Sequence, residues 1–593
     1  MLNSSPPNSR LATVLVYFLT VLTILQLFKL QVIDYKKYST LAQSQIKTLD
    51  TLVTKRGTIY TKDGVVLSAD SPSWSVIVSV TNPVDMELFL KQKNAIVEFL
   101  VSHLGAERSV IEEKLPKEPT YESIKNLSKE EKLIRLENVT PPITYKTLIK
   151  DISQREKEAL EKKRFPGIYT KEYIKRIYPN GRLASHIIGF VGQDSNGNPI
   201  GQYGLEGFFW GDIKGKMGMS EREKDLLGNA ILSKEYENIT FRQGKNISIT
   251  INAGIQKKVE QKLEESVRDF SADSGTAVLM DPKTGAIIAM ANYPDYDPNF
   301  YYNVKDTKVY KNKAVGDIYE YGSVQKPLTI AMAINEGLIT KDTICNDTGE
   351  LKVLDKKIYN YDFRKYGKIT PKDVLKNSVN VCTAQFGLKI GPEKMSEYLK
   401  KLGIGQVVGI GLEDEEVAFL KSPEKWIETD TATISFGQTV SASSLQVLSA
   451  LSTIANNGKR MQPYLVDRIY NNEEVIKIEP QEVGQIFTEE TSKEVASMME
   501  YAIMSQPYLA KYRGSYKIAG KTGTAQVAKP TGGYYEDRVI VTFVGFSPTK
   551  DAKMIMLVRV ENPRRSTIAS ASALPVWLNI FDAIKDDLGI NRK

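Results

Sequence analysis

Histidine and cysteine are scarce in this chain, which has two of each among 593 residues. His103 and His186 are the only imidazoles, so a Ser-His-Asp mechanism would have to use one of these two side chains. Cys345 and Cys382 are the only thiols, which excludes a thiolate zinc site and a framework of several disulfides, while one bridge between them stays open. We therefore expect any chemistry in this chain to depend on other side chains.

A large excess of charge of either sign is also missing. The 79 basic and 71 acidic residues leave a net charge of +8 and an isoelectric point near 8.9. Over this length the bias is mild, and we expect no nucleic-acid partner. The hydrophobic share of 41% and the charged share of 25% are ordinary for globular proteins, which excludes disordered and fibrous classes. The length predicts several domains.

One long uncharged run is present, at residues 11–28. It is just long enough to cross the hydrocarbon core of a bilayer as a helix. A helix that packs on a globular core would have one polar face, and a signal peptide would have a small-x-small cleavage site. This run has neither feature. We therefore expect an uncleaved anchor, although the basic residues on both sides leave its orientation open.

The next region, residues 34–245, combines short strand-like pieces with a helical part. A hairpin is predicted at 56–68, with its turn at Asp63-Gly64. Between about 88 and 163 a stretch rich in lysine and glutamate predicts solvated amphipathic helices on a small core. We identify no catalytic constellation here.

From residue 246 onward the pattern predicts strands at both ends of a long helical middle. Residues 275–292 form a candidate hairpin, and 515–527, 538–548 and 553–563 are three further candidate strands. An amphipathic helix is expected at 571–588. This order predicts one antiparallel sheet that is completed by segments distant in the sequence, in an α+β fold.

The first candidate chemical motif is Ser323-Val-Gln-Lys326. A serine hydroxyl needs a neighbouring base to act as a nucleophile, and residues three apart share one face of a helix. Lysine can be that base only if burial or a second cation lowers the pKa of its amine. Pro327 is tolerated best in the first turn of a helix, so we expect Ser323 at a helix N-terminus, where backbone N–H groups stabilise negative charge. By itself the motif is common and usually lies on an ordinary surface helix.

Two further motifs follow along the chain. Ser378-Val-Asn380 places a hydroxyl and an amide at alternate positions, where they could relay a proton and hold a substrate amide. Lys521-Thr522-Gly523-Thr524 has the character of an edge strand, along which a substrate backbone could pair. Each motif alone is more often a polar turn or a plain strand. Their conjunction in this order is the combination of penicillin-binding proteins and serine β-lactamases.

The chain resembles a class B penicillin-binding protein, a peptidoglycan D,D-transpeptidase, and more closely the division-type subgroup. The matching motifs lie at residues 56–64, 176–179, 186–192, 204–207, 437–438, 445–446, 454–458 and 543–548. The resemblance implies an α+β multidomain protein with a single N-terminal transmembrane helix, an elongated mixed α/β pedestal, and a transpeptidase domain with a central antiparallel five-stranded sheet flanked by helices. The implied domains are a tail and anchor at 1–33, a non-catalytic pedestal or dimerisation domain at 34–245, and the transpeptidase domain at 246–593.

The resemblance also implies a role for each motif residue. Ser323 would be the acylated nucleophile and Lys326 its base, while Ser378 and Asn380 would relay protons and position the substrate. Lys521, with Thr522, Gly523 and Thr524, would bind the terminal carboxylate of the donor peptide. The backbone N–H groups of Ser323 and Thr524 would form the oxyanion hole.

The implied reaction cross-links stem peptides that end in D-Ala-D-Ala, releases D-alanine, and requires neither a metal nor an organic cofactor. β-Lactams would acylate Ser323 as inhibitors. The implied location is the cytoplasmic membrane, crossed once, with the catalytic domain on the extracytoplasmic side. The implied partners are the lipid bilayer, a polytopic membrane glycosyltransferase and other cell-wall assembly proteins.

Some positions depart from the family pattern. Tyr321 and Gln325 stand where proline and phenylalanine are common, and Thr61-Lys62 keeps only the basic member of an aspartate-arginine pair. None of these positions is expected to supply a reacting group. Three alternatives stay open: a carboxypeptidase or β-lactamase-like hydrolase, a non-catalytic assembly scaffold, and a β-lactam sensor. The anchor and the pedestal argue against a secreted hydrolase, and the intact motifs argue against a scaffold.

Overall fold

The computed structural model describes residues 7–36, 47–52, 55–80, 83–117, 119–137, 144–215, 218–223, 243–529 and 533–592. The chain divides into two compact units. The first consists of residues 1–56 and 214–244, and the second of residues 57–213 and 245–593. The domain boundary predicted at residue 246 therefore lies within the second unit, which contains residues from both sides of it.

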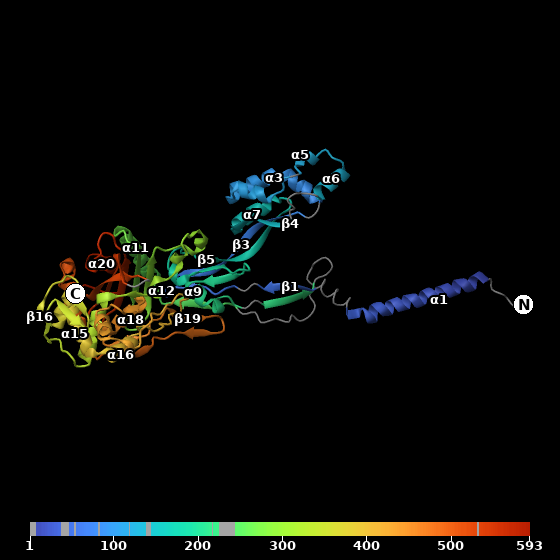
Figure 1. Ribbon diagram of the computed structural model, residues 1–593. Coiled ribbons are helices and arrows are strands. Elements are labelled where there is room, and N and C mark those ends of the chain that lie inside the picture. The colour runs from blue at the N-terminus through green and yellow to red at the C-terminus, as the bar shows by residue number, and fades with distance from the viewer. Residues whose placement is uncertain are drawn as a thin grey trace. The chain divides into compact units, whose positions relative to one another are not determined.

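The first unit contains the expected apolar helix. Helix α1 (Pro7–Phe28) continues into a short π-helical turn, η1 (Lys29–Ile33), and the stretch Thr13–Ile33 is long and apolar enough to cross a membrane (Figure 1). Strand β1 (Lys47–Leu52) pairs antiparallel with β8 (Gly218–Glu223) in the same unit. Residues 1–6 of the predicted N-terminal segment lie outside the described residues.

A seven-stranded sheet forms the first part of the second unit, with the order β20-β19-β9-β2-β3-β4 and with β5 paired to β3. Its strands are β2 (Ile59–Tyr60), β3 (Val66–Ser79), β4 (Thr144–Ile152), β5 (Ile168–Ile177), β9 (Asn246–Ile249), β19 (Val466–Tyr470) and β20 (Val475–Lys477). The predicted hairpin is present as β2 and β3, with Gly64 in the left-handed region at φ 83°. Strands from near residue 470 thus complete a sheet that begins near residue 59.

Helices cover part of this sheet, as the lysine- and glutamate-rich pattern predicts. They are α3 (Pro83–Leu104), α4 (Arg108–Lys114), α5 (Tyr121–Ile124), α6 (Lys129–Glu137) and α7 (Gln154–Lys163). The interruption by strand β4 was not expected. Its segment places Leu148 and Ile152 in the core beside β3, and the strand pairing outweighs the helical character of the flanking sequence.

Three of the matching pedestal motifs meet in one buried ion-pair cluster. The Arg176 guanidinium donates to Glu206 Oε1 at 2.6 Å, to Ser68 Oγ at 2.8 Å and to the Gly57 carbonyl at 2.8 Å. Asp70 lies 3.4 Å away. The cluster ties the segments around β2, β3 and β5 to helix α9 (Gly204–Phe208), because Ser68 and Asp70 lie in β3, Gly57 precedes β2 and Glu206 lies in α9.

The five-stranded antiparallel sheet is present, with the order β11-β10-β24-β23-β22. Its strands are β10 (Ser274–Met280), β11 (Ile287–Tyr293), β22 (Ala519–Ala528), β23 (Tyr534–Ser547) and β24 (Met554–Glu561). The two N-terminal and three C-terminal strands join between β10 and β24. Strand β22, which carries the Lys-Thr-Gly motif, lies at the edge, as the sequence predicts.

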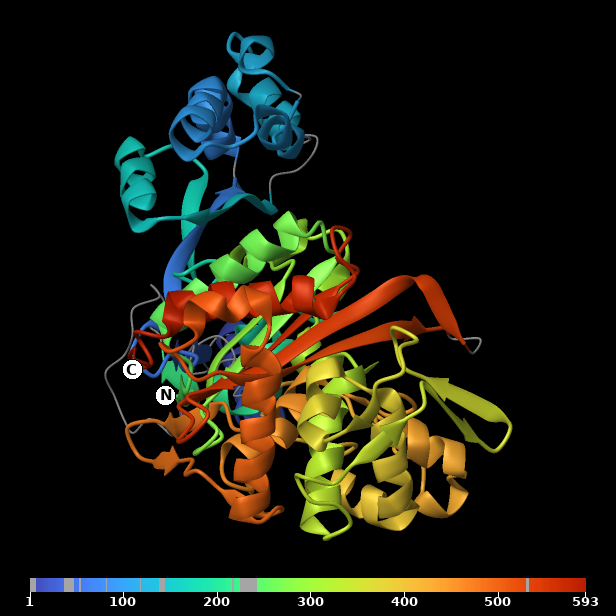
Figure 2. The same ribbon diagram turned by 90° about the vertical axis from the view of Figure 1, so that its left-hand side faces the viewer.

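Helices cover both faces of this sheet. Helices α11 (Ala253–Asp269) and α20 (Ala573–Ile584) lie side by side on one face, drawn in green and red in Figure 2. Helix α18 (Ser444–Ala455) packs on the other face. Along β10 the side chains alternate accordingly: Ala277 and Leu279 join the first layer, and Val278 and Met280 join the second. The remaining helices of the middle region are α12 (Lys313–Gly316), α13 (Lys326–Asn335), α14 (Pro371–Asn377), α15 (Asn380–Ile390), α16 (Pro392–Lys401), α17 (Glu428–Ile434) and α19 (Glu489–Met504).

Candidate active site

Ser323 lies in a short 3₁₀ turn, η4 (Gly322–Gln325), which leads directly into helix α13. Pro327 occupies the first turn of α13, as expected from its missing N–H. The serine is therefore one turn before the α-helix rather than in it. Because a 3₁₀ turn contains three residues, it brings Ser323 and Lys326 onto the same side of the chain.

Glycines allow the backbone of this turn to touch two neighbouring segments. A Cβ on Gly523 of β22 would lie 2.6 Å from the Tyr321 carbonyl oxygen, and a Cβ on Gly437 would lie 1.9 Å from the Gly322 carbonyl oxygen. The Gly322 N–H donates to the Gly437 carbonyl at 3.0 Å. The turn that carries Ser323 is thus held between the edge strand and the segment after α17.

Ser378 and Asn380 lie where helices α14 and α15 meet. Ser378 ends α14 in the left-handed region with φ 54°, which is uncommon for a residue other than glycine. Asn380 begins α15, and its Nδ2 donates to the Tyr359 carbonyl at 2.9 Å. The Asn380 backbone N–H donates to Asn360 Oδ1 at 2.9 Å. A neighbouring loop therefore fixes the asparagine of this motif.

The two cysteines form a disulfide bond close to this motif. Cys345 and Cys382 have their Cα atoms 6.0 Å apart, and Cys382 lies two residues beyond Asn380 on α15. The sequence alone left this pairing open. The bridge fastens strand β13 (Cys345–Asp347) to the helix that starts with Asn380.

The structure brings Lys326, Ser378, Asn380 and Lys521 together in one hydrogen-bond network. Lys326 Nζ lies 2.7 Å from Asn380 Oδ1 and 3.1 Å from Ser378 Oγ, and it also donates to the Ser378 carbonyl. Lys521 Nζ donates to Ser378 Oγ at 3.0 Å and to the Thr522 carbonyl at 3.0 Å. The Ser378 hydroxyl thus bridges the two amines.

Both amines are buried, and burial disfavours their charged forms. Lys326 is 0% exposed and Lys521 is 2% exposed. Desolvation, together with the positive charge of Lys521, holds the pKa of Lys326 well below its usual range. Desolvation lowers the pKa of Lys521 to about 7. A neutral Lys326 amine has a free lone pair, which is the condition that a lysine base must meet.

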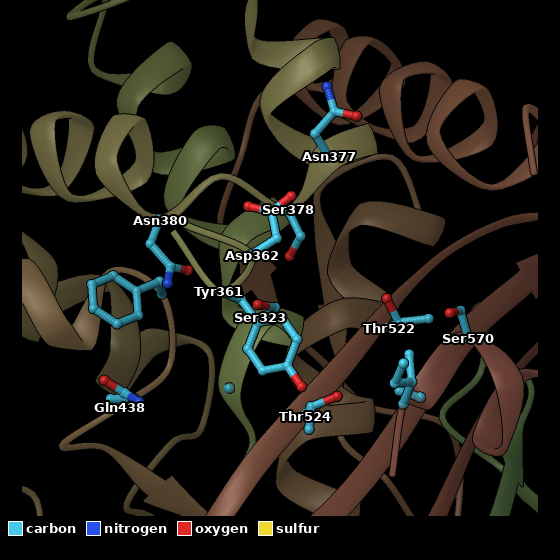
Figure 3. Close-up of a pocket in the computed structure, with 14 residues that line it drawn as sticks. Ser323, Tyr361, Asp362, Asn377, Ser378, Asn380, Gln438, Thr522, Thr524 and Ser570 are labelled. Atoms are coloured by element: carbon cyan, nitrogen blue, oxygen red, sulfur yellow. The ribbon is translucent and has the colours of Figure 1, made fainter. Parts of the chain in front are cut away.

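Ser323 lines a cavity of about 240 Å³ in front of this network (Figure 3). Thr522 and Thr524, on one face of β22, line the same cavity. The cavity is bounded by Gly322, Ser323, Tyr361, Asp362, Asn377, Ser378, Asn380, Phe436, Gln438, Thr522, Thr524, Ile568, Ala569 and Ser570. Lys326 and Lys521 lie behind this lining.

The hydroxyl of Ser323 has no hydrogen-bond partner within the described residues, and it forms no hydrogen bond to Lys326. The three contacts of the Lys326 amine go to Ser378 and Asn380. Catalytic hydrogen bonds often tighten only when substrate is bound. Ser323 and Lys326 are three residues apart, so both lie on the same side of the 3₁₀ turn.

Two cavity residues were not singled out from the sequence, and a third was not expected at the site. Tyr361 and Asp362 come from the loop after β15 (Lys356–Tyr359). Gln438 belongs to the matching motif at 437–438, for which no role at the site was expected, and it follows the glycine that contacts η4. No local motif marks Tyr361 or Asp362, because only the fold brings their loop beside Ser378. No three His, Cys, Asp or Glu side chains gather as a metal site would require anywhere in the described ranges.

Comparison with known proteins gives a consistent result. The family description "Penicillin binding protein transpeptidase domain" matches residues 275–583, and "Penicillin-binding Protein dimerisation domain" matches residues 51–249. Stage V sporulation protein D of Bacillus subtilis is 29% identical over 545 residues, which cover 90% of this chain and 79% of that protein. The peptidoglycan D,D-transpeptidase FtsI of Buchnera aphidicola (subsp. Schizaphis graminum) is 28% identical, covering 98% and 94% of the two chains.

Solved structures show the same fold. Penicillin-binding protein 2X of Streptococcus thermophilus superposes with a TM-score of 0.71 at 24% identity, covering 92% of this chain and 81% of that chain. Penicillin-binding protein 3 of Mycobacterium tuberculosis, complexed with aztreonam, superposes with a TM-score of 0.62 at 25% identity, covering 71% and 92%.

The family match spans more than half of the chain, and it contains all three motifs that meet around the cavity. The resemblance that the sequence predicted is thereby confirmed, and the FtsI names among the relatives agree with the division-type subgroup. The chain belongs to the class B penicillin-binding proteins, the peptidoglycan D,D-transpeptidases.

Proposed function

We propose that this transpeptidase works through an acyl-enzyme on Ser323, with Lys326 as the base. The observation that carries the proposal is the buried Lys326 amine, which hydrogen-bonds to Ser378 and Asn380 while Lys521 lies on the other side of Ser378. A lysine in this position favours its neutral form and can take a proton from a nearby hydroxyl.

The proton positions follow from the contacts. A neutral amine has two N–H donors and one lone pair, and the Asn380 Oδ1 and Ser378 carbonyl oxygens are acceptors only. Those two oxygens use both donors, so the lone pair is free for the Ser323 or Ser378 hydroxyl proton. Asn380 and the Ser378 carbonyl thus hold the amine in the orientation that a base needs.

In the first half-reaction Ser323 Oγ attacks the carbonyl carbon between the two D-alanines. The Oγ–C bond forms, the C–N bond breaks, and the proton taken by Lys326 passes to the departing D-alanine amine. In the second half an amine of a neighbouring stem peptide attacks the ester carbon. The new C–N bond replaces the C–Oγ bond, and the proton released by the amine returns to Ser323 through the same network.

Strand β22 would hold the donor peptide. It is the edge strand of the sheet, so its outer N–H and C=O groups can pair with an extended peptide. Thr522, Thr524 and Lys521 would bind the terminal carboxylate, with Gly523 allowing the close approach of η4. The backbone N–H groups of Ser323 and Thr524 would stabilise the oxyanion.

Labelling with a fluorescent penicillin tests the nucleophile. Wild type should form a covalent adduct, because a β-lactam carbonyl mimics the donor amide, and the structure of penicillin-binding protein 3 with aztreonam supports this expectation. Ser323→Ala should form none, while Ser497→Ala, on the exposed side of α19, should label like wild type. Equal labelling of wild type and Ser323→Ala would exclude Ser323 as the nucleophile.

Product analysis separates transpeptidation from hydrolysis, the leading alternative. With a D-Ala-D-Ala donor and an added acceptor amine, a transpeptidase yields the new amide, and a hydrolase yields only the free acid. Formation of free acid alone at saturating amine would favour a carboxypeptidase.

We further propose that α1 anchors the protein in the cytoplasmic membrane, with the transpeptidase domain on the extracytoplasmic side. There the enzyme would act in septal or elongation cell-wall synthesis. The apolar stretch Thr13–Ile33 supports a single span. A membrane glycosyltransferase that polymerises glycan strands is the partner that such a cross-linking enzyme requires. A reporter fused after residue 593 that is active only in the cytoplasm would overturn the orientation.

A further inference from the structure

The cavity in front of Ser323 has two chemically different walls. On one side are Thr522 and Thr524 of the edge strand, with Lys521 behind them. On the opposite side are Tyr361 and Asp362, from the loop between β15 and β16 (Gly367–Ile369). In Figure 3 the Tyr361 side chain extends from this loop across the cavity toward Thr524, and Asp362 lies beside Ser378. We call these two residues the Tyr361–Asp362 wall.

Asp362 is the only charged residue among the described residues that line the cavity, so the cavity has a carboxylate but no lining cation. A donor peptide that ends in a carboxylate would be repelled by it, so the donor must end on the Thr522 and Thr524 side. The carboxylate on the other wall then suits a substrate group of positive charge.

The charge of Asp362 is maintained by its surroundings. Its carboxylate accepts a hydrogen bond from the Tyr366 hydroxyl at 2.7 Å and another from the Arg364 backbone N–H at 3.1 Å. The hydrogen bond from Tyr366 and the bond from Arg364 outweigh desolvation and lower the pKa of Asp362. The Arg364 side chain approaches to 3.6 Å but is 76% exposed, and such a surface pair is weak enough to yield to a competing ammonium.

Tyr361 adds an aromatic surface next to this charge. Its side chain is 72% exposed even though it lines the cavity, so its ring is free to receive a substrate. A ring face attracts an ammonium group and also packs against the methylenes next to it. A primary amine at the end of an aliphatic chain matches both members of the wall.

The loop that carries the wall is fastened to the catalytic motif. Asn360, which is 2% exposed, accepts hydrogen bonds from the backbone N–H groups of Asn380 and Val381 and donates to Asp347 Oδ2 at 2.9 Å. The Tyr366 N–H donates to the same Asp347 oxygen at 2.7 Å. The position of the wall relative to the lysine network is therefore set by the fold.

We infer that Tyr361 and Asp362 form the subsite for the acceptor, a stem-peptide side chain that ends in a primary ammonium. This inference rests on the proposed acyl-enzyme on Ser323. The wall holds the cationic amine beside the ester that forms on Ser323, opposite the strand that holds the donor. The ammonium first releases one proton to solvent water. Its nitrogen then attacks the ester, and the second proton passes through the Lys326–Ser378 network to Ser323. The wall thereby selects acceptors by charge.

The test measures how the acyl-enzyme divides between amine and water. The full-length protein in membranes is given a D-alanyl thioester donor and increasing concentrations of either Nα-acetyl-lysine amide or its uncharged counterpart with a terminal hydroxyl. The ratio of transfer product to hydrolysis product is read for each variant. This ratio is set after acylation, so it does not depend on the rate at which the donor reacts.

Asp362→Asn should raise the amine concentration needed for half-maximal transfer about two- to fivefold, which corresponds to one surface charge pair. Its use of the hydroxyl acceptor should stay close to that of wild type. Tyr361→Leu should weaken amine transfer similarly, and Tyr361→Phe should restore it, because phenylalanine keeps the ring face. The matched control is Asp355→Asn, an exposed aspartate in the turn between β14 (Glu350–Val353) and β15 that does not line the cavity.

Two results would overturn the inference. An unchanged ratio in both Asp362→Asn and Tyr361→Leu would show that the wall does not bind the acceptor. An equal loss with the amine and the hydroxyl acceptor would show that these residues only support the loop. If wild type instead formed no acyl-enzyme, the proposed role of Ser323 would fail, and the penicillin labelling above identifies that case separately.

Discussion

Single atoms around Lys326 decide whether its amine is charged. The Asn380 amide oxygen accepts a hydrogen bond from this amine at 2.7 Å but carries no charge. Asn380→Asp would place a carboxylate at the same position, which favours the ammonium form and removes the lone pair that a base needs. We expect acylation by penicillin at neutral pH to slow about a hundredfold or more. Stopped-flow labelling measures this rate.

The matched control for this change is Asn377→Asp, on the same cavity but without a hydrogen bond to Lys326. It introduces the same charge without direct contact with the Lys326 amine, so its effect on the acylation rate should be much smaller. Equal slowing by both variants would show that general cavity charge, rather than the pKa of Lys326, controls the rate.

The burial of Lys521 predicts a pH dependence of stability. Burial lowers the pKa of its amine to about 7, whereas the unfolded chain keeps the ordinary value of 10.5. Between these values the unfolded chain binds more protons, so burial of the lysine becomes less unfavourable as the pH rises. Relative to Lys521→Met, wild type should gain up to about 1.4 kcal/mol per pH unit from about pH 7 upward. Melting temperatures of both proteins at about pH 7 and about pH 9 measure the difference, and parallel curves would contradict it.

At the scale of elements, the site depends on close contact between backbones. Gly437 has φ 85°, and a Cβ there would lie 1.9 Å from the carbonyl oxygen of Gly322 in the turn before Ser323. Gly437→Ala should therefore displace η4, lower the melting temperature and reduce penicillin labelling at least tenfold. Gly197→Ala is the control, because Gly197 has φ 81° but nothing within 4 Å of its Cβ position.

The control isolates the clash from backbone strain, since a left-handed backbone costs a residue with a Cβ about 1 to 2 kcal/mol at either position. Similar stability and labelling of the two variants would mean that contact between η4 and the Gly437 segment is unimportant for the site.

At the scale of the whole molecule, one buried ion pair holds the pedestal segments together. Arg176 and Glu206 are both almost fully buried, and the arginine also contacts Ser68 and the Gly57 carbonyl. Arg176→Met would leave the Glu206 carboxylate buried without its cationic partner, although the Ser68 hydroxyl still donates to it, at a cost of about 3 to 5 kcal/mol. We expect a large fall in the melting temperature, read by circular dichroism of the detergent-solubilised protein.

Arg182→Met is the comparison for this change. Its guanidinium pairs with Asp295 at 2.5 Å but is 53% exposed, so its loss should cost at most about 1 kcal/mol. If both variants melted alike, the Arg176 cluster would not be a determinant of pedestal stability. Penicillin labelling of Ser323 in the folded Arg176→Met variant, measured well below its melting temperature, would then show whether the transpeptidase domain needs an intact pedestal.

Much of the site could be predicted from the sequence because the motif residues carry their chemistry in their side chains. Ser323, Lys326, Ser378, Asn380 and Lys521 were identified from residue type, order and family resemblance, and the structure places the last four in one network. The hairpin at β10 and β11 and the strands β22 to β24 were predicted for the same reason: alternating apolar residues and turn residues act locally.

The apolar N-terminal helix, the strands, the three motifs and the family can be read from the amino-acid sequence, because each depends on residues close together in the chain. The disulfide pairing of Cys345 with Cys382 and the placement of Tyr361 and Asp362 opposite the edge strand are apparent only in the folded chain. The same is true of the 3₁₀ turn around Ser323 and of its hydroxyl, which is unpaired within the described residues. These features depend on which distant segments share a surface, and the free energy of that packing is spread over many residues that no local pattern contains.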